Sequence, residues 1–378
     1  MMKKNRILFI QPLLPTYSID FFNEMLAQSP ELELTVAANL KSKSPLNQLS
    51  QGDVAFNTLH LEFTKLGPFQ WICGLWKAIN AKGFDIVVFS GNPRDLSQLL
   101  AMFIMKAHRR KVYVWGMFHK IGRQRWHTRS YYKLVAKVAD KLLTYSRTGA
   151  RNLASLGVPE EKISIIGTAI DQRRTRDCAS QVSETDIKDF LKEQGLTGKK
   201  IVLQVVRLSA IKKPGFLLEA AKEILKERND IVFVLIGDGE MRSELESKVI
   251  DYDISHAVRF MGAIYNEAQL AKWFLASSVF VMSTCIGLSA HHALSYGLPV
   301  ITDDSLEDQA SEFDVLAHGI NSLIYRKNDI DDFKNKLIYL VQEKNVLLQM
   351  SQNAFFTISQ VYSIENKAEN MVRSLTEK

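Results

Sequence analysis

Apolar runs alternate with amphipathic segments along most of the chain. In the first half, the apolar runs predict strands at 6–10, 33–38, 85–90, 111–115 and 140–145. In the second half, they predict strands at 201–206, 231–237, 258–262, 278–282 and 299–302. Helical spacing occurs between or after these strands, at 17–27, 70–81, 93–107, 127–138, 266–274 and 363–375. Because the strands are apolar on both faces and helices lie between them, we expect parallel sheets covered by helices on both sides.

A polar stretch over residues 171–198 interrupts this alternation. A chain of 378 residues also exceeds the usual size of a single hydrophobic core. We therefore predict an α/β protein with two doubly wound, Rossmann-like domains that face a cleft. The first domain would comprise residues 1–172 and the second residues 196–358, with 173–195 as the linker.

The composition is that of an ordinary globular protein, with 46% hydrophobic and 24% charged residues. The N-terminal apolar run predicts a first strand instead of a signal peptide, because Gln11 and Pro12 interrupt it. No apolar run approaches twenty residues, so we expect no membrane span. Cys73, Cys178 and Cys285 are too far apart to suggest a disulfide framework or a metal site, which favours a cytoplasmic location.

The net charge of +7 is unevenly distributed, because residues 1–172 are strongly basic and the rest is mildly acidic. This asymmetry favours an anionic partner for the first half alone. A basic stripe on the helix expected near 127–138, together with an aromatic loop, predicts a surface that binds an anionic membrane. Its residues are Trp71, Arg125, Arg129, Lys133 and Lys137. A solvated covering helix is the alternative, and without a motif that reads bases we expect no nucleic-acid partner.

Residues 287–302 predict a short helix whose first turn binds phosphate. We expect Ser289 to cap this helix and Gly297 to end it. The amino end of a helix attracts a diphosphate. Arg207 and Lys212, just past an earlier strand, would add two cations that stabilise a departing nucleoside diphosphate without a metal ion. Taken alone, these two residues favour solvated surface charges, and it is their combination with the downstream helix that favours a diphosphate site.

Four stretches of the sequence resemble a known family. They are VVRLSAIKKP (205–214), GDGEMRSELESKV (237–249), ADKLLTYS with LGVPEEKISIIGTAID (139–146 and 156–171), and GLSAHHALSYGLPVI (287–301). They resemble the retaining glycosyltransferases of family 4, which have the GT-B fold. The resemblance implies that the second domain binds a nucleoside diphosphate sugar and that the first binds a saccharide acceptor. It also implies transfer without a metal ion or other cofactor. The last helix, 360–378, would cross back to the first domain.

One departure from the family concerns two glutamates, eight residues apart, whose positions here are held by Thr284 and His292. Both side chains still form hydrogen bonds with hydroxyl groups, and Glu312 offers a nearby carboxylate. The donor-binding residues that the match implies are Gly237, Asp238, Thr284, Gly287, Leu288, Ser289, His292 and Glu312. Catalytic roles fall to Arg207 and Lys212 at the leaving diphosphate, and to His119 near the sugar or the attacking hydroxyl.

Polar residues that follow two strands of the first domain predict an acceptor site. His119 follows the strand at 111–115, while Asn92 and Arg94 follow the strand at 85–90. The carboxyl ends of strands in an open α/β sheet line ligand sites. Tyr17, at the start of the first helix, joins Asn92 and Arg94 as an acceptor candidate. An ordinary surface histidine and an ordinary helix start are the alternatives.

We therefore expect a retaining hexosyltransferase for surface polysaccharide (O-antigen, capsule or exopolysaccharide). Its acceptor would be lipid-linked, at the inner face of the cytoplasmic membrane. Two other functions fit the same residues. One is a catalytically silent GT-B protein that binds a glycan or a partner, and the other is a sugar-nucleotide epimerase.

Overall fold

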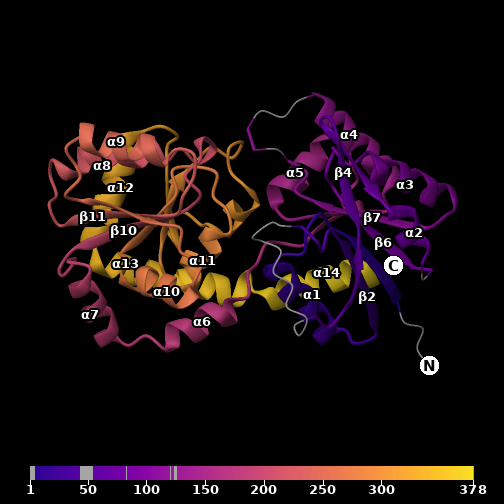
Figure 1. The fold of residues 1–378 in the computed structure, drawn as a ribbon, viewed down its shortest axis with the longest axis horizontal. Coiled ribbons are helices and arrows are strands. Elements are labelled where there is room, and N and C mark those ends of the chain that lie inside the picture. The colour runs from indigo at the N-terminus through magenta and orange to yellow at the C-terminus, as the bar shows by residue number, and fades with distance from the viewer. Residues whose placement is uncertain (1–4, 43–53, 82, 120, 123–125, 378) are drawn as a thin grey trace. The chain divides into compact units, whose positions relative to one another are not determined.

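The computed structural model describes residues 5–42, 54–81, 83–119, 121–122 and 126–377. The chain divides into two compact units (Figure 1). Unit 1 is Met1–Thr168 with Ile364–Lys378, and unit 2 is Ala169–Ser363. Each unit has hydrophobic clusters of its own. No helix within the described ranges has the length and apolarity needed to cross a lipid bilayer.

Among the described residues of unit 1, seven strands form one parallel sheet in the order β3-β2-β1-β6-β7-β8-β9. The strands are β1 (Asn5–Ile10), β2 (Leu32–Ala38), β3 (Asn57–His60), β6 (Ile86–Ser90), β7 (Lys111–Gly116), β8 (Lys141–Thr144) and β9 (Ile163–Ile165). The five inner strands were expected from their apolar runs. The edge strands β3 and β9 were not, because their residues are exposed or half-buried and show no such run.

Helices join the strands of unit 1 and cover the sheet. They are α1 (Thr16–Gln28), α2 (Leu75–Asn80), α3 (Leu96–Ala107), α4 (Trp126–Val138), α5 (Arg147–Ser155) and α14 (Ile364–Thr376). The last of these, α14, packs on α1. Within that contact, the ammonium group of Lys367 lies 4.4 Å from the centroid of the Phe21 ring. The end of the chain therefore belongs to the unit that its first half builds.

A β-hairpin occupies part of a segment where a helix was expected. The prediction of a helix over 70–81 was wrong for its first residues, because β4 (Glu62–Leu66) pairs antiparallel with β5 (Phe69–Cys73). Only α2 is helical, and it begins after Gly74. Gly74 has a φ of 78°, a left-handed conformation that breaks the strand before the helix starts.

In unit 2, whose residues 169–363 are all described, six strands form a parallel sheet in the order β12-β11-β10-β13-β14-β15. They are β10 (Lys200–Val205), β11 (Ile231–Ile236), β12 (Val258–Gly262), β13 (Val279–Val281), β14 (Val300–Asp303) and β15 (Ser322–Tyr325). The first five match the expected strands. The sixth, β15, was missed because its four residues include a serine and make too short an apolar run.

Helices also flank the sheet of unit 2, and the principal ones are α8 (Pro214–Leu225), α9 (Arg242–Asp251), α10 (Glu267–Ala276), α11 (Ser289–Ser295), α12 (Ile330–Gln342) and α13 (Lys344–Phe356). As expected, the Asn266 side chain caps α10 by accepting a hydrogen bond from the backbone amide of Gln269 at 3.0 Å. The polar segment expected to link the domains forms α6 (Gln172–Ser180) and α7 (Glu184–Glu193). The Phe190 ring of α7 packs edge-on against Trp273 of α10, so this segment covers unit 2.

Candidate functional site

Two loops at the carboxyl ends of β10 and β11 are locked together by backbone contacts. A side chain at Gly237 would place its Cβ 1.8 Å from the carbonyl oxygen of Val206, and one at Gly239 would come within 2.3 Å of the Leu208 carbonyl. The amide of Leu208 donates to the carbonyl of Asp238 at 3.0 Å. Only glycine allows this approach, so both glycines fix the turn that carries Arg207.

The Arg207 side chain is exposed, and its guanidinium lies 3.4 Å from a carboxylate oxygen of Glu240. Asp238, also exposed, accepts a hydrogen bond from the amide of Gly239 and lies 3.8 Å from the guanidinium of Arg242. Exposed ion pairs of this kind are weak. An anionic ligand at this edge of the sheet therefore competes with Glu240 for Arg207 at little cost.

Lys212 lies against the loop that precedes α11. Its ammonium group donates to the carbonyl of Cys285 and is 3.5 Å from the Cys285 sulfur. A Cβ at Gly287 would be 3.8 Å from the same ammonium. Two segments that are more than seventy residues apart in the sequence thus place a cation directly beside the turn expected to bind phosphate.

The helix α11 begins one residue earlier than expected. Its N-cap is Leu288, and Ser289 is the first helical residue, so the expectation that Ser289 caps the helix was wrong. The turn at Gly287 already bends back, because the amide of Ala290 donates to the carbonyl of Gly287 at 2.9 Å. Gly297, with a φ of 70°, lies in the turn that ends the helix, as predicted.

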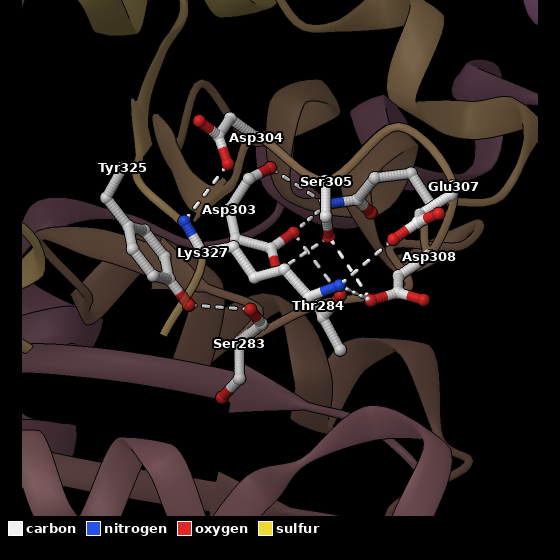
Figure 2. Close-up of polar contacts among 10 residues, drawn as sticks. Ser283, Thr284, Asp303, Asp304, Ser305, Glu307, Asp308, Tyr325 and Lys327 are labelled. Carbon is white, nitrogen blue, oxygen red and sulfur yellow. Dashed lines mark hydrogen bonds and ion pairs between the residues drawn. The ribbon is translucent and has the colours of Figure 1, made fainter. Parts of the chain in front are cut away.

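A buried polar network lies behind the same loop (Figure 2). The Thr284 hydroxyl donates to Oδ1 of Asp303 at 3.2 Å, and the Ser305 hydroxyl donates to Oδ2 at 2.9 Å. The amide group of Gln309 donates to Oδ1 at 2.6 Å, while its oxygen accepts from the backbone amide of Ile286 at 2.8 Å. This network ties the loop after β13 to the loop after β14.

The carboxyl group of Asp303 is almost fully buried. Burial raises its pKa, and the hydrogen bonds from Ser305 and Thr284 act in the opposite direction. Figure 2 shows two further contacts that hold these loops: the Tyr325 hydroxyl donates to the carbonyl of Ser283 at 2.6 Å, and Lys327 forms an ion pair with Asp308 at 2.6 Å. Thr284, expected to meet the donor, is thus buried and directed toward Asp303.

Glu312 lies in a short 3-10 helix, Ser311–Val315, near the same loop. Burial raises the pKa of the Cys285 thiol, Lys212 lowers it, and the charge of Glu312 raises it further. The charges of Lys212 and Glu312 thus both act on the Cys285 thiol. The assignment of Glu312 to the donor site stays a prediction of the resemblance.

His292 lies on α11 and faces α10. Its Nε2 atom lies 2.8 Å from a carboxylate oxygen of Glu267, to which the hydroxyl of Tyr296 also donates at 2.5 Å. Burial by itself would raise the pKa of Glu267, but the hydrogen bonds from His292 and Tyr296 lower it overall. His291, by contrast, is fully buried. Sequence analysis missed Glu267, which lies at the start of a helix 25 residues away and carries no local signal.

In unit 1, His119 and Arg94 line one cavity of about 790 Å³. His119 is buried, and its Nδ1 is 3.0 Å from the carbonyl of Met117. Asn92 contributes to the loop itself, because its side-chain oxygen accepts from the amide of Arg94 at 3.1 Å. Tyr17 is exposed on the first turn of α1. The structure thus brings one expected acceptor residue, Arg94, and the expected catalytic residue His119 to a common cavity.

The expected membrane residues lie on two elements of unit 1. Arg129, Lys133 and Lys137 are exposed on α4, and Trp71 is exposed on β5. Arg125 lies outside the described residues. The three exposed cations of α4 are the part of the predicted basic stripe that the structure describes.

Two family models match the chain. Residues 186–355 match the glycosyl transferases group 1, and residues 32–174 match glycosyltransferase family 4. The two matches account for most of both units.

The chain belongs to the group 1 glycosyltransferases of family 4. A relative of this glycosyltransferase is the UDP-Gal:α-D-GlcNAc-diphosphoundecaprenol α-1,3-galactosyltransferase of Escherichia coli, 29% identical over 226 residues, 58% of this chain and 55% of that protein. Another is the amylovoran biosynthesis glycosyltransferase AmsK of Erwinia amylovora, 23% identical over 187 residues, 47% of this chain and 42% of that protein. The matched stretch spans about half the length of the curated relatives.

Solved structures confirm the fold class of this group 1 glycosyltransferase. The crystal structure of Anabaena Alr3699/HepE in complex with UDP superposes with a TM-score of 0.76 at 14% identity, over 99% of this chain and 100% of that one. The likeness supports the predicted GT-B class with two Rossmann-like domains. Within the described ranges, no group of three His, Cys, Asp or Glu side chains is placed to hold a metal ion. Metal-independent transfer stays a prediction.

Proposed function

We propose that this protein is a retaining glycosyltransferase that moves a sugar from a nucleoside diphosphate sugar to a lipid-linked saccharide acceptor in surface polysaccharide synthesis. The observation that carries the proposal is the position of Lys212, whose ammonium group lies against the Cys285–Gly287 loop. Arg207 emerges from the neighbouring turn with an exposed guanidinium. These two cations suit a leaving diphosphate.

The proposed transfer requires stabilisation of the negative charge that develops on the leaving diphosphate. The bond between the sugar C1 and the diphosphate oxygen breaks, while C1 bonds to the acceptor oxygen on the same face. The acceptor proton passes to the departing diphosphate. Cations held by the protein at the β-phosphate stabilise the charge that develops there, and they act without a metal ion.

Uridine nucleotides are the first donors to test. The Anabaena structure was determined with UDP, and another crystal of the same protein with UDP-glucose. The name of the Escherichia coli relative includes UDP-Gal and a diphosphoundecaprenol acceptor. In this chain we assign His292 to the hydroxyl groups of the nucleoside, because Glu267 holds the ring through Nε2 and the other ring nitrogen, Nδ1, is the one that would form a hydrogen bond with such groups.

Transfer is tested by incubating the protein with a panel of UDP-sugars and with a lipid-linked saccharide fraction. We expect a product from at least one donor, with the anomeric configuration of the donor kept in the new linkage. An inverted linkage would contradict the retaining mechanism. Conversion of the donor without any acceptor would identify an epimerase instead.

A silent nucleotide-binding protein is the second candidate, and one observation favours it. The hydroxyl of Thr284 is buried and hydrogen-bonded to Asp303. It is therefore less able than an exposed side chain to form a hydrogen bond with the donor sugar. UDP binding with neither transfer nor hydrolysis for any donor would support this candidate and exclude the transferase.

We also propose that unit 1 binds the surface of an anionic membrane through the exposed cations of α4. Each cation near an anionic leaflet contributes about 1 kcal/mol, and salt screens the attraction. We expect the protein to float with anionic vesicles at low salt and to dissociate as salt rises. The double variant Lys133→Ala/Lys137→Ala should float less, whereas Lys188→Ala, an exposed residue of unit 2, should not change. No flotation at low salt would contradict the proposal.

A further inference from the structure

An apolar stripe lies exposed along α3 in unit 1. Leu96, Leu100 and Phe103 are 39%, 52% and 42% exposed. Their spacing of four and three residues places them on one face of the helix. Trp71 and Trp76, on the neighbouring β5 and α2, are 39% and 47% exposed. Exposed apolar groups gathered in this way mark an interaction surface.

The stripe connects two hollows. Leu96 and Leu99 line the cavity of about 790 Å³ that contains His119. One turn further along α3, Leu100 and Ile104 line a second hollow of about 230 Å³. The adjacent strand repeats this order, because Phe69 lines the first hollow and Trp71 the second. The two hollows therefore follow one another along the same helix and strand.

The hollows differ in chemistry. The first is lined by Arg94, His119 and His127, among other residues. Its carboxylate, Asp95, accepts hydrogen bonds from Gln70, Ser90 and Gln98, so it is held by the protein. The second hollow is lined by tryptophan and aliphatic side chains with Lys77, and no carboxylate is among the described residues that line it. The first hollow therefore suits an anionic group, and the second suits a hydrocarbon chain.

The wall between the hollows is held by hydrogen bonds between β5 and the start of α3. The amide of Gln70 donates to the carbonyl of Arg94 at 2.9 Å. The amide of Ile72 donates to the hydroxyl of Ser97, also at 2.9 Å. Both bonds join distant parts of the sequence, and they fix the hairpin against the helix. A ligand that occupies both hollows meets a surface that is already formed, which reduces the entropic cost of binding.

We propose that the two hollows form one site for an amphiphilic acceptor. The anionic head lies in the first hollow beside Arg94 and His119, and the hydrocarbon chain follows Leu96 and Leu100 into the second. This inference rests on the proposed transferase function, since it identifies the acceptor of that reaction. The occupant of the second hollow is the hydrocarbon chain of the acceptor itself. A hollow with cationic residues and an apolar hollow follow one another along α3, and they match the anionic head and the hydrocarbon chain of one molecule.

Binding of two probes to the full-length protein tests the site. The probes are farnesyl diphosphate and inorganic diphosphate, measured by titration calorimetry with excess UDP present to occupy unit 2. We expect farnesyl diphosphate to bind at least about tenfold more tightly than inorganic diphosphate. Leu100→Gln should weaken only the farnesyl probe, by about tenfold, whereas Arg94→Ala should weaken both.

Ile165→Gln is the matched control, because Ile165 is 45% exposed on β9 of the same unit and is not among the residues that line either hollow. It should change neither affinity. Leu96→Gln is a second stripe variant, and thermal unfolding checks that all variants fold. Equal binding of both probes, or farnesyl affinity unchanged by both stripe variants, would overturn the inference.

Vesicle flotation and UDP binding distinguish an acceptor site from a lipid-binding surface and from the nucleotide site of unit 2. If Leu100→Gln reduces flotation with acceptor-free anionic vesicles as strongly as it reduces farnesyl binding, the stripe meets bulk lipid and the inference fails. UDP binding by the same variants reports on unit 2. If the unmodified protein binds no nucleoside diphosphate, UDP included, the proposed function fails. If it binds UDP but not the probes, this inference alone fails.

Discussion

The Nε2 atom of His292 lies 2.8 Å from Oε1 of Glu267, and the hydroxyl of Tyr296 donates to that same oxygen. The resemblance places a glutamate of the family at position 292. In this chain the position carries an imidazole, and the carboxylate comes from α10. A carboxylate is therefore still present next to position 292, but it belongs to Glu267. It orients His292 through a hydrogen bond.

Replacement of Glu267 should make stability depend on pH in a specific way. The folded-state pKa of Glu267 is below its usual 4.5, so the ionised carboxylate stabilises the fold above about pH 4.5 and loses this effect as pH falls through the lowered value. We expect Glu267→Gln to cost about 1–3 kcal/mol at pH 7. The cost should shrink below pH 4.5. Urea unfolding across this range measures it, with the exposed Glu193→Gln as the control, and a pH-independent difference would refute the prediction.

Removal of the Lys212 ammonium should impair transfer far more than folding. We expect Lys212→Ala to lower kcat by about 100-fold to 1000-fold, the range found for a donor that stabilises charge in a transition state. UDP affinity should fall as well. Lys188→Ala, which removes an exposed lysine of α7, should leave both unchanged. Steady-state kinetics and UDP titration measure these effects, and wild-type kcat in Lys212→Ala would remove the main support for the proposed function.

Asp303 should tolerate asparagine better than alanine. Asp303→Ala leaves Thr284, Ser305 and Gln309 without their acceptor, and we expect a loss of about 2–4 kcal/mol in unfolding free energy. Burial raises the pKa of Asp303 above 3.8, so the ionised carboxylate becomes a growing cost to the fold as pH rises from there. Asp303→Asn carries no such cost. The unfolding free energy of Asp303→Asn, relative to that of the wild type, should therefore rise from pH 4 to pH 7. A fall over this range would contradict the prediction.

Gly237 and Gly198 provide a matched pair of glycines. Both have positive φ, 141° and 75°, but a Cβ at Gly237 would meet the carbonyl of Val206 at 1.8 Å, whereas one at Gly198 would meet nothing within 4 Å. We expect Gly198→Ala to cost about 1 kcal/mol from backbone strain alone. Gly237→Ala should cost about 3 kcal/mol and also weaken UDP binding, because the turn of Arg207 must move. Thermal unfolding and UDP titration compare them, and equal costs would show that the close approach is unimportant.

Local sequence was sufficient for the inner strands and for the residues at their ends. A strand buried on both faces needs a continuous apolar run, so β1, β6, β7, β10 and β11 were visible directly. Arg207, Lys212 and Gly237 follow such runs, and parallel strands bring their carboxyl ends to one edge of a sheet. The basic stripe of α4 was also visible in the sequence, because a spacing of four residues along a helix is a local property.

Long-range contacts decided the rest. The hairpin pairs locally, but it is held on the start of α3 by Gln70 and Ile72, whose partners at residues 94–97 lie about 25 positions away. Glu267 and Asp303 acquire their roles only when α10 meets α11 and β14 lies beside β13. The two hollows beside α3 depend on side chains from several separate elements. The sequence alone thus determined which residues become buried strands and which follow them, whereas the tertiary structure determined which polar and apolar side chains meet, because those meetings depend on packing between distant segments.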